Sequence, residues 1–91
     1  MVTYKLVVQE PMGLHLRPAG KLCECSQRFT CRILLKKGTQ TANVKSVLGL
    51  LAARVTQGDE IELICDGSDE EEALAALISC LQEEFETEKE D

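Results

Sequence analysis

The sequence predicts an α+β fold, a two-layer sandwich with the element order βαββαβα, and three observations support it. The chain has 91 residues, of which 44% are hydrophobic, so it is expected to form one globular domain. Four short segments are rich in β-branched or alternating apolar residues, which is typical of strands. Three other segments carry apolar residues at helical spacing or begin with a capping residue. A generic ferredoxin-like domain would share the two layers but would lack the short middle helix.

The four predicted strands are separated by turn-forming residues. Residues 3–8 form the first strand, which Pro11 and Gly13 bring to an end. Residues 31–36 form the second strand, because buried-type and charged residues alternate there. Residues 40–42 form a short third strand. The fourth strand follows residues 57–59 and places on one face Ile61, Leu63 and Cys65.

The first predicted helix runs from Leu16 to about Arg28. Its apolar face is expected to contain Ala19, Leu22, Cys23 and Ser26. The same spacing directs outward, beside the start of the helix, Leu16, Gly20 and Glu24.

Two further helices are predicted downstream. Ser46 is the expected N-cap of a brief helix from Val47 to about Ala53. Ser68 and Glu71 form a capping box for the last helix. The buried stripe of this helix is expected to be Leu74, Leu77, Ile78, Leu81 and Phe85. We therefore expect a domain over residues 1–85 and a charged, frayed tail over residues 86–91.

The net charge of −6 is unevenly distributed along the chain. Residues 69–91 hold ten acids and one lysine, a balance of −9, whereas residues 1–68 hold six acids and nine bases, a balance of +3. No basic stripe with stacking aromatics is present, so nucleic-acid binding is not expected. The sequence has no membrane-length apolar run and no signal-peptide pattern, which predicts a cytoplasmic protein.

The five cysteines do not form a recognisable framework. Their odd number and irregular spacing argue against secreted disulfides, and Cys23 and Cys25 are one residue too close for a zinc knuckle. Cysteine is commonly a small buried hydrophobe, so we expect core packing. No metal and no cofactor are predicted.

The only histidine, His15, lies where the first helix is expected to begin. Pro18 suits the first helical turn because its missing N–H would have no intrahelical partner there. The remaining N–H groups and the helix dipole favour an anion beside His15, and neutral imidazole is a nucleophile near neutral pH. This chemistry predicts a histidine that accepts a phosphoryl group, with Arg17 as its counter-charge. The alternative is a histidine that only caps the helix.

A second informative segment, residues 42–51, contains the pair Lys45 and Ser46. Together with the run from Gly13 to Ala19, it resembles the HPr family, the histidine-containing phosphocarriers of the bacterial phosphotransferase system. The resemblance extends from about Tyr4 to about Leu81. It implies an HPr-like, open-faced sandwich with an antiparallel four-stranded sheet covered by helices on one face.

The resemblance also implies roles for particular residues. His15, Arg17 and Pro18 match the active-site motif of the family, with His15 as phosphoryl acceptor, Arg17 stabilising the phosphate and Pro18 structural. Ser46 matches the regulatory phosphorylation site, although it could act only as an N-cap. The residues expected to meet partners are Leu16, Gly20, Glu24, Val47, Leu48 and Leu51.

The implied function is a phosphoryl relay and not an autonomous enzyme. Enzyme I would donate the phosphoryl group and sugar-specific IIA components would accept it. HPr kinase/phosphorylase and a transcriptional regulator are further implied partners, and we expect a monomer.

Three differences from the family pattern bear on partner choice. Glu24 and Gln27 stand where many relatives carry lysine or other partner-facing residues, and Leu16 is larger than the usual threonine or alanine. Arg54 occupies a position where relatives often have glycine, and we expect its side chain to face solvent, with a second phosphate contact as the alternative.

The sequence is also compatible with three alternatives. One is a regulatory, nitrogen-branch relay that serves no sugar permease. Another is a binding module that controls a transcription factor through phospho-Ser46, although relatives specialised in that way have lost the active-site histidine. The last is a domain of a fused phosphotransferase.

Overall fold

The computed structural model describes the backbone of residues 1–86 and the side chains of residues 1–84. The predicted order βαββαβα is confirmed. The elements are β1 (Val2–Val7), α1 (Leu16–Ser26), β2 (Arg32–Lys37), β3 (Gln40–Asn43), α2 (Val47–Ala52), β4 (Glu60–Asp66) and α3 (Glu70–Glu86). Most of the predicted tail, residues 87–91, lies outside the described residues.

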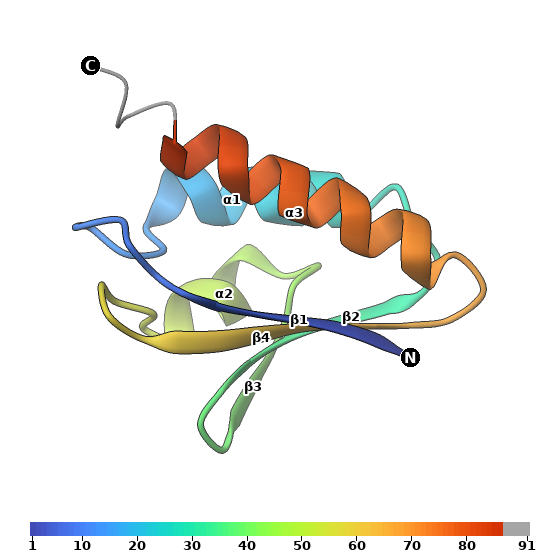
Figure 1. Ribbon diagram of the computed structural model, residues 1–91, viewed down its shortest axis with the longest axis horizontal. Helices are drawn as coiled ribbons and strands as arrows, with labels where there is room; N and C mark the ends of the chain where they lie inside the picture. Colours follow the sequence, from blue (N-terminus) through green and yellow to red (C-terminus); the bar gives the residue numbers. More distant parts are fainter. Residues whose placement is uncertain (87–91) are drawn as a thin grey trace.

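The four strands form one antiparallel sheet in the order β1-β4-β2-β3. Strand β4 lies between β1 and β2, with Leu63 opposite both Tyr4 and Leu35. α1 and α3 lie side by side over one face of the sheet, and α2 packs against α1 and β3 (Figure 1). The other face carries no helix within residues 1–86, so the predicted open-faced sandwich is confirmed.

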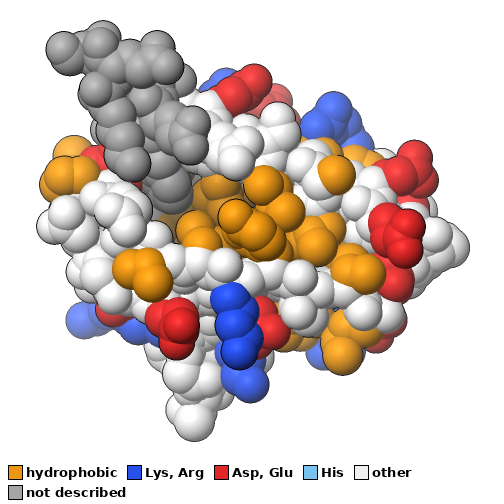
Figure 2. All heavy atoms as spheres, in the orientation of Figure 1, with side chains coloured by type: hydrophobic (Ala, Val, Ile, Leu, Met, Phe, Trp, Pro, Cys, Tyr) orange, Lys and Arg blue, Asp and Glu red, His pale blue; other side chains and the backbone are white. Residues whose placement is uncertain are grey.

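The core lies between the sheet and the helices. Its largest fully buried apolar side chains are Leu22, Ile33, Leu35, Leu50, Leu63 and Leu77. Hydrophobic side chains also gather on the face where α3 and β1 lie (Figure 2). Val2, Leu6 and Leu74 are half-buried side chains packed against this core. The edge of the core beside β1 is therefore less fully covered than its centre.

The predicted helix faces are correct in most positions. In α1, Ala19, Leu22 and Ser26 are buried, as predicted. Cys23 was also expected on this face but is only half-buried, and Cys25 is buried instead. In α3, Leu77 and Leu81 are buried. Leu74 and Ile78 are half-buried, because they lie at the edges of the apolar face of the helix. The predicted contribution of the Phe85 side chain lies outside the described residues.

The start of α3 differs from the predicted capping box of Ser68 and Glu71. The Gly67 N–H donates to Glu70 Oε1 at 3.1 Å, so the carboxylate that folds back belongs to the residue before Glu71. Asp69, which the sequence did not single out, accepts from the backbone N–H groups of Thr30 and Cys31, both at 2.9 Å. The carboxylate at this helix start therefore ties α3 to the chain entering β2.

Removing the Asp69 charge should reduce stability in a pH-dependent way. The Thr30 N–H bond is the main reason why the pKa of Asp69 lies below its ordinary value of 3.8. A lowered folded-state pKa contributes stability above the unfolded-state pKa, and this contribution is lost as the pH falls through the folded-state value. Asp69→Asn should therefore lower the urea midpoint at pH 7, with the difference from wild type shrinking below about pH 4. As a control, Glu60→Gln removes an exposed carboxylate and should lower the urea midpoint at pH 7 much less than Asp69→Asn does.

Two leucines of α2 allow a matched test of core packing. Leu50 is fully buried, whereas the side chain of Leu48 is 80% exposed. Leu50→Ala leaves a cavity and should lower the free energy of unfolding by about 2–5 kcal/mol. Leu48→Ala should change it by less than about 0.5 kcal/mol. Chemical denaturation of both variants measures the difference, and equal losses would contradict the described burial.

Candidate functional site

The loop before α1 is held against the segment that follows α2. The Leu14 N–H donates to the Val55 carbonyl at 3.0 Å, and the Leu14 side chain is buried. Gly13 has a φ of +66°, and a Cβ at this position would collide with the same carbonyl. Only glycine combines this left-handed conformation with such a close backbone approach. The position of the next residue, His15, is thus fixed by backbone contacts.

His15 is the N-cap residue of α1. Its backbone is extended, with φ −88° and ψ −171°, and its carbonyl accepts from the Ala19 N–H at 3.0 Å. Its imidazole makes no capping hydrogen bond and the residue is half-buried, so His15 caps the helix through its backbone alone. The N–H groups of Leu16 and Arg17 belong to the first turn of α1. No carbonyl group of the helix lies before them to accept their hydrogen bonds. His15 therefore directly precedes two backbone donors at the positive end of a helix.

Arg17 and Pro18 lie in the same first turn as His15. Pro18 is buried, as its structural role requires. The Arg17 side chain is 66% exposed, and its Nε lies 3.3 Å from Oε1 of Glu84 near the end of α3. The sequence did not single out Glu84, because no local pattern relates residues that are so far apart in the chain.

Ser46 is the N-cap of α2, as predicted. Its Oγ accepts from the Gly49 N–H at 3.0 Å, and the residue is half-buried. Gln27 Nε2 donates to the Lys45 carbonyl at 2.9 Å, and Lys45 Nζ donates to the Phe29 carbonyl at 2.6 Å. These bonds join the segment before α2 to the end of α1. The two predicted phosphorylation sites therefore lie at the starts of two helices that pack against each other.

The residues expected to meet partners differ in exposure. Leu16 is 66% exposed and Leu48 is 80% exposed. Glu24 is also exposed. The half-buried members of the set are Gly20, Val47 and Leu51, and Leu51 packs against the core. The first turns of α1 and α2 thus each present one exposed leucine.

Arg54 follows α2 directly and has an exposed side chain, as predicted. Its φ is +53°, and it is the only non-glycine residue with positive φ among those described. Lys37 Nζ donates to the Arg54 carbonyl at 2.7 Å and pairs with Asp59 at 3.0 Å. The main cause of the lowered pKa of Asp59 is the bond from the Thr56 N–H, followed by the bond from Lys37. These interactions hold the segment next to Gly13 and Leu14 in place despite the strained residue.

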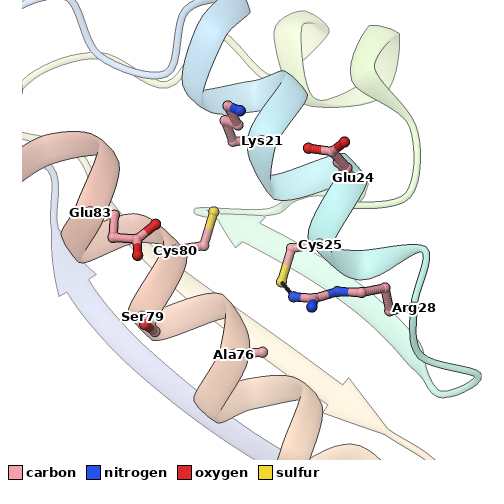
Figure 3. A pocket seen from close by; sticks show the side chains of 8 residues that line it. All are labelled: Lys21, Glu24, Cys25, Arg28, Ala76, Ser79, Cys80 and Glu83. Carbon is pink, nitrogen blue, oxygen red and sulfur yellow. Dashed lines mark hydrogen bonds between the residues drawn. The ribbon is translucent and has the colours of Figure 1, made fainter.

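The cysteines lie away from His15. Cys25, Cys31 and Cys65 are buried, Cys23 and Cys80 are half-buried, and all five are free thiols. Cys25 and Cys80 line a groove of about 620 Å³ between α1 and α3 (Figure 3). Arg28 Nη2 donates to Cys25 Sγ at 3.2 Å, and burial is the main reason why the pKa of Cys80 rises to about 11. A raised pKa lowers thiolate content and so opposes thiol reactivity.

The described residues offer no composite metal site. Among the side chains of residues 1–84, no three histidine, cysteine or acidic groups converge as possible ligands. The helices of this part of the chain also lack the length and apolar character that a membrane crossing needs.

Comparison with known proteins links this geometry to one family. The family model described as the phosphotransferase system HPr component phosphorylation site matches residues 2–83. The HPr-like protein Crh of Bacillus subtilis is 40% identical over 84 residues, which cover 92% of this chain and 99% of Crh. The phosphocarrier protein HPr of Treponema pallidum is 36% identical over 88 residues, which cover 97% of this chain and all of that protein. The solved structure of a mycoplasma histidine-containing phosphocarrier protein superposes with a TM-score of 0.91 at 25% identity, covering 92% of this chain and 96% of that one.

The left-handed conformation of Arg54 predicts that glycine is better tolerated there than alanine. Arg54→Gly relieves the unfavourable contact of Cβ with the backbone and should raise the free energy of unfolding by about 0.5–1 kcal/mol. Arg54→Ala removes the same charge but keeps Cβ, so it should bring no such gain. Urea denaturation of both variants separates the backbone effect from the charge effect. An equal gain in both would show that the charge, and not the backbone, is responsible.

Proposed function

This chain belongs to the HPr family of phosphocarriers, and we propose that His15 is its phosphoryl acceptor. In this proposal phospho-enzyme I donates the group and IIA components of the phosphotransferase system receive it. An imidazole nitrogen attacks phosphorus, and the new phosphorus–nitrogen bond forms as the bond from phosphorus to the donor breaks. The next acceptor reverses this chemistry. The protein is therefore a relay and not a catalyst.

The position of His15 carries the proposal. Its imidazole is not used as a cap, and the two backbone N–H groups beside it can bind phosphate oxygens. No acidic residue lies in the first turn of α1, so this turn itself contributes no negative charge beside the phosphoryl group. The exposed Arg17 guanidinium in the same turn supplies a permanent positive charge. These features favour a phosphoryl group that is stabilised but still accessible to the next acceptor.

The exposed leucines support docking at the helix starts that carry His15 and Ser46. Leu16 lies directly next to His15, and Leu48 lies on α2, which packs against α1. Apolar side chains near the reactive residue suit brief contacts with several partners. Gly20, Glu24, Val47 and Leu51 complete the proposed partner surface. The basic balance of residues 1–68 would favour partners with acidic surfaces.

Ser46 is the proposed regulatory phosphorylation site. A phosphate on its Oγ would lie at the start of α2, where the backbone dipole favours negative charge, so the fold should tolerate it. The added charge would change the surface around Val47 and Leu48 and oppose docking of an acidic partner. HPr kinase/phosphorylase would add and remove this phosphate.

A regulatory protein without a direct role in sugar uptake is the second candidate. The 40% identity to the HPr-like protein Crh favours it. A nitrogen-branch relay would also fit the same site. Acceptor choice separates these functions, because a transport relay should pass its phosphoryl group rapidly to a sugar-type IIA component.

The first experiment is intact-mass analysis after incubation with enzyme I and phosphoenolpyruvate. Wild-type protein should gain one acid-labile phosphoryl group, because phosphohistidine is acid-labile. His15→Ala should gain none, whereas Ser46→Ala should be phosphorylated like wild type.

Both variants remove a side chain that lies outside the core, so circular dichroism should show the same fold in all three proteins. Phosphorylation of His15→Ala by enzyme I would contradict the assignment of the acceptor. If several active enzyme I preparations fail to phosphorylate the wild type, the result would favour the second candidate, a regulatory protein controlled by phosphorylation of Ser46.

A further inference from the structure

The loop before α1 and the segment after α2 lie side by side and run in opposite directions. The Leu14 N–H donates to the Val55 carbonyl at 3.0 Å. One residue earlier in the loop, a Cβ on Gly13 would lie 2.8 Å from the Cα of Thr56, which is one residue later in the other segment. A step toward the N-terminus in one segment therefore matches a step toward the C-terminus in the other, as in an antiparallel pair.

The same register brings His15 next to Arg54. His15 directly follows Leu14, and Arg54 directly precedes Val55, so these two residues form the next pair along the antiparallel segments. Lys37 Nζ donates to the Arg54 carbonyl at 2.7 Å, which holds this part of the second segment in place. The Arg54 side chain therefore starts from a fixed backbone position beside the proposed phosphoryl acceptor.

The backbone conformation of Arg54 costs stability. Its φ is +53°, a region in which the Cβ of an L-residue approaches the backbone too closely. A glycine would adopt this conformation without that cost. Strained residues of this kind cluster at functional sites, where the strain is part of the mechanism. The strain therefore suggests that the Arg54 side chain has a role that glycine could not fulfil.

The fold leaves the guanidinium of Arg54 unused. The residue is exposed, and within the described part of the chain its side chain has no recorded hydrogen bond or ion pair. By contrast, the Arg28 guanidinium donates to a cysteine sulfur at 3.2 Å. A guanidinium carries a permanent positive charge and presents its N–H donors in a planar fork that matches phosphate oxygens. Arg54 thus offers a free phosphate-binding group close to His15.

We infer that Arg54 is a second phosphate-binding cation of this site and contacts the phosphoryl group carried by His15. This inference rests on the proposed function. In the phosphorylated protein the Arg54 guanidinium donates hydrogen bonds to phosphate oxygens from the side of α2, while Arg17 and the first N–H groups of α1 serve the phosphate from the side of α1. In the unphosphorylated protein the guanidinium stays in solvent. Arg54 therefore stabilises the phosphorylated carrier.

The test measures how phosphoryl groups distribute between enzyme I and this protein at equilibrium, so the rate of docking does not affect the result. Arg54→Ala removes the guanidinium and should shift the distribution away from the phosphorylated carrier by about two- to fivefold. Arg54→Gly should cause the same shift even though it stabilises the fold. Arg32→Ala removes an exposed arginine of β2 that lies on the helix-free face of the sheet, and it should leave the distribution unchanged.

A spectroscopic measurement separates a direct contact from a general effect of charge. The NMR resonance of the Arg54 Nε–H group should move when His15 is phosphorylated and return when the phosphoryl group is lost. The resonance of the Arg32 Nε–H group should stay in place throughout.

The possible failures can be told apart. A wild-type protein that takes no phosphoryl group from enzyme I overturns the proposed function and the inference together. If the wild type is phosphorylated but Arg54→Ala gives the same distribution, the inference alone is overturned. An equal shift in Arg32→Ala also overturns it, because net charge and not contact would then be responsible. An Arg54 Nε–H resonance that does not respond to phosphorylation has the same consequence.

Discussion

The contact between the Gly13–Leu14 backbone and the Val55 carbonyl joins the loop before α1 to the segment after α2. The reactive end of the molecule depends on it, since His15 follows Leu14 directly and Arg54 precedes Val55. The bonds from Lys37 to the Ala53 and Arg54 carbonyls hold the second segment from the side of β2. Interactions of the backbone, and not a network of side chains, therefore fix the proposed acceptor, His15, while its imidazole makes no capping hydrogen bond.

The site is built at helix starts, where free backbone N–H groups can bind an anion without a deep cleft. His15 and Ser46 are both N-cap residues, but their side chains are used differently. The Ser46 hydroxyl satisfies a backbone donor of α2, whereas the His15 imidazole leaves the first donors of α1 to another acceptor. A small domain can thus offer an anion-binding position on its surface, where large protein partners can reach it.

Most of the fold was predictable, because strand alternation, helical spacing and turn residues all indicated the same order of elements. Local rules also identified the Ser46 cap and the position of His15 at the start of α1. They failed where distant segments meet. The Arg17–Glu84 pair, the Asp69 bonds to β2 and the left-handed Arg54 arise from tertiary contacts that no local spacing encodes. The roles of His15 and Arg17 were predicted from chemistry at the helix start, and those of the other site residues from the family resemblance, so none was predicted from these contacts.

The strand order has a consequence for the way the chain folds. In the described part of the chain β1 pairs with β4 alone. Val2 must therefore find Cys65, 63 residues away, and Leu6 must find Ile61, 55 residues away. Such long loops close slowly, and their entropy cost precedes any stabilisation by the contacts they bring together. During synthesis on the ribosome β1 emerges first but stays unpaired until β4 has emerged. The sheet is therefore completed late, and its first strand is the last to gain a partner.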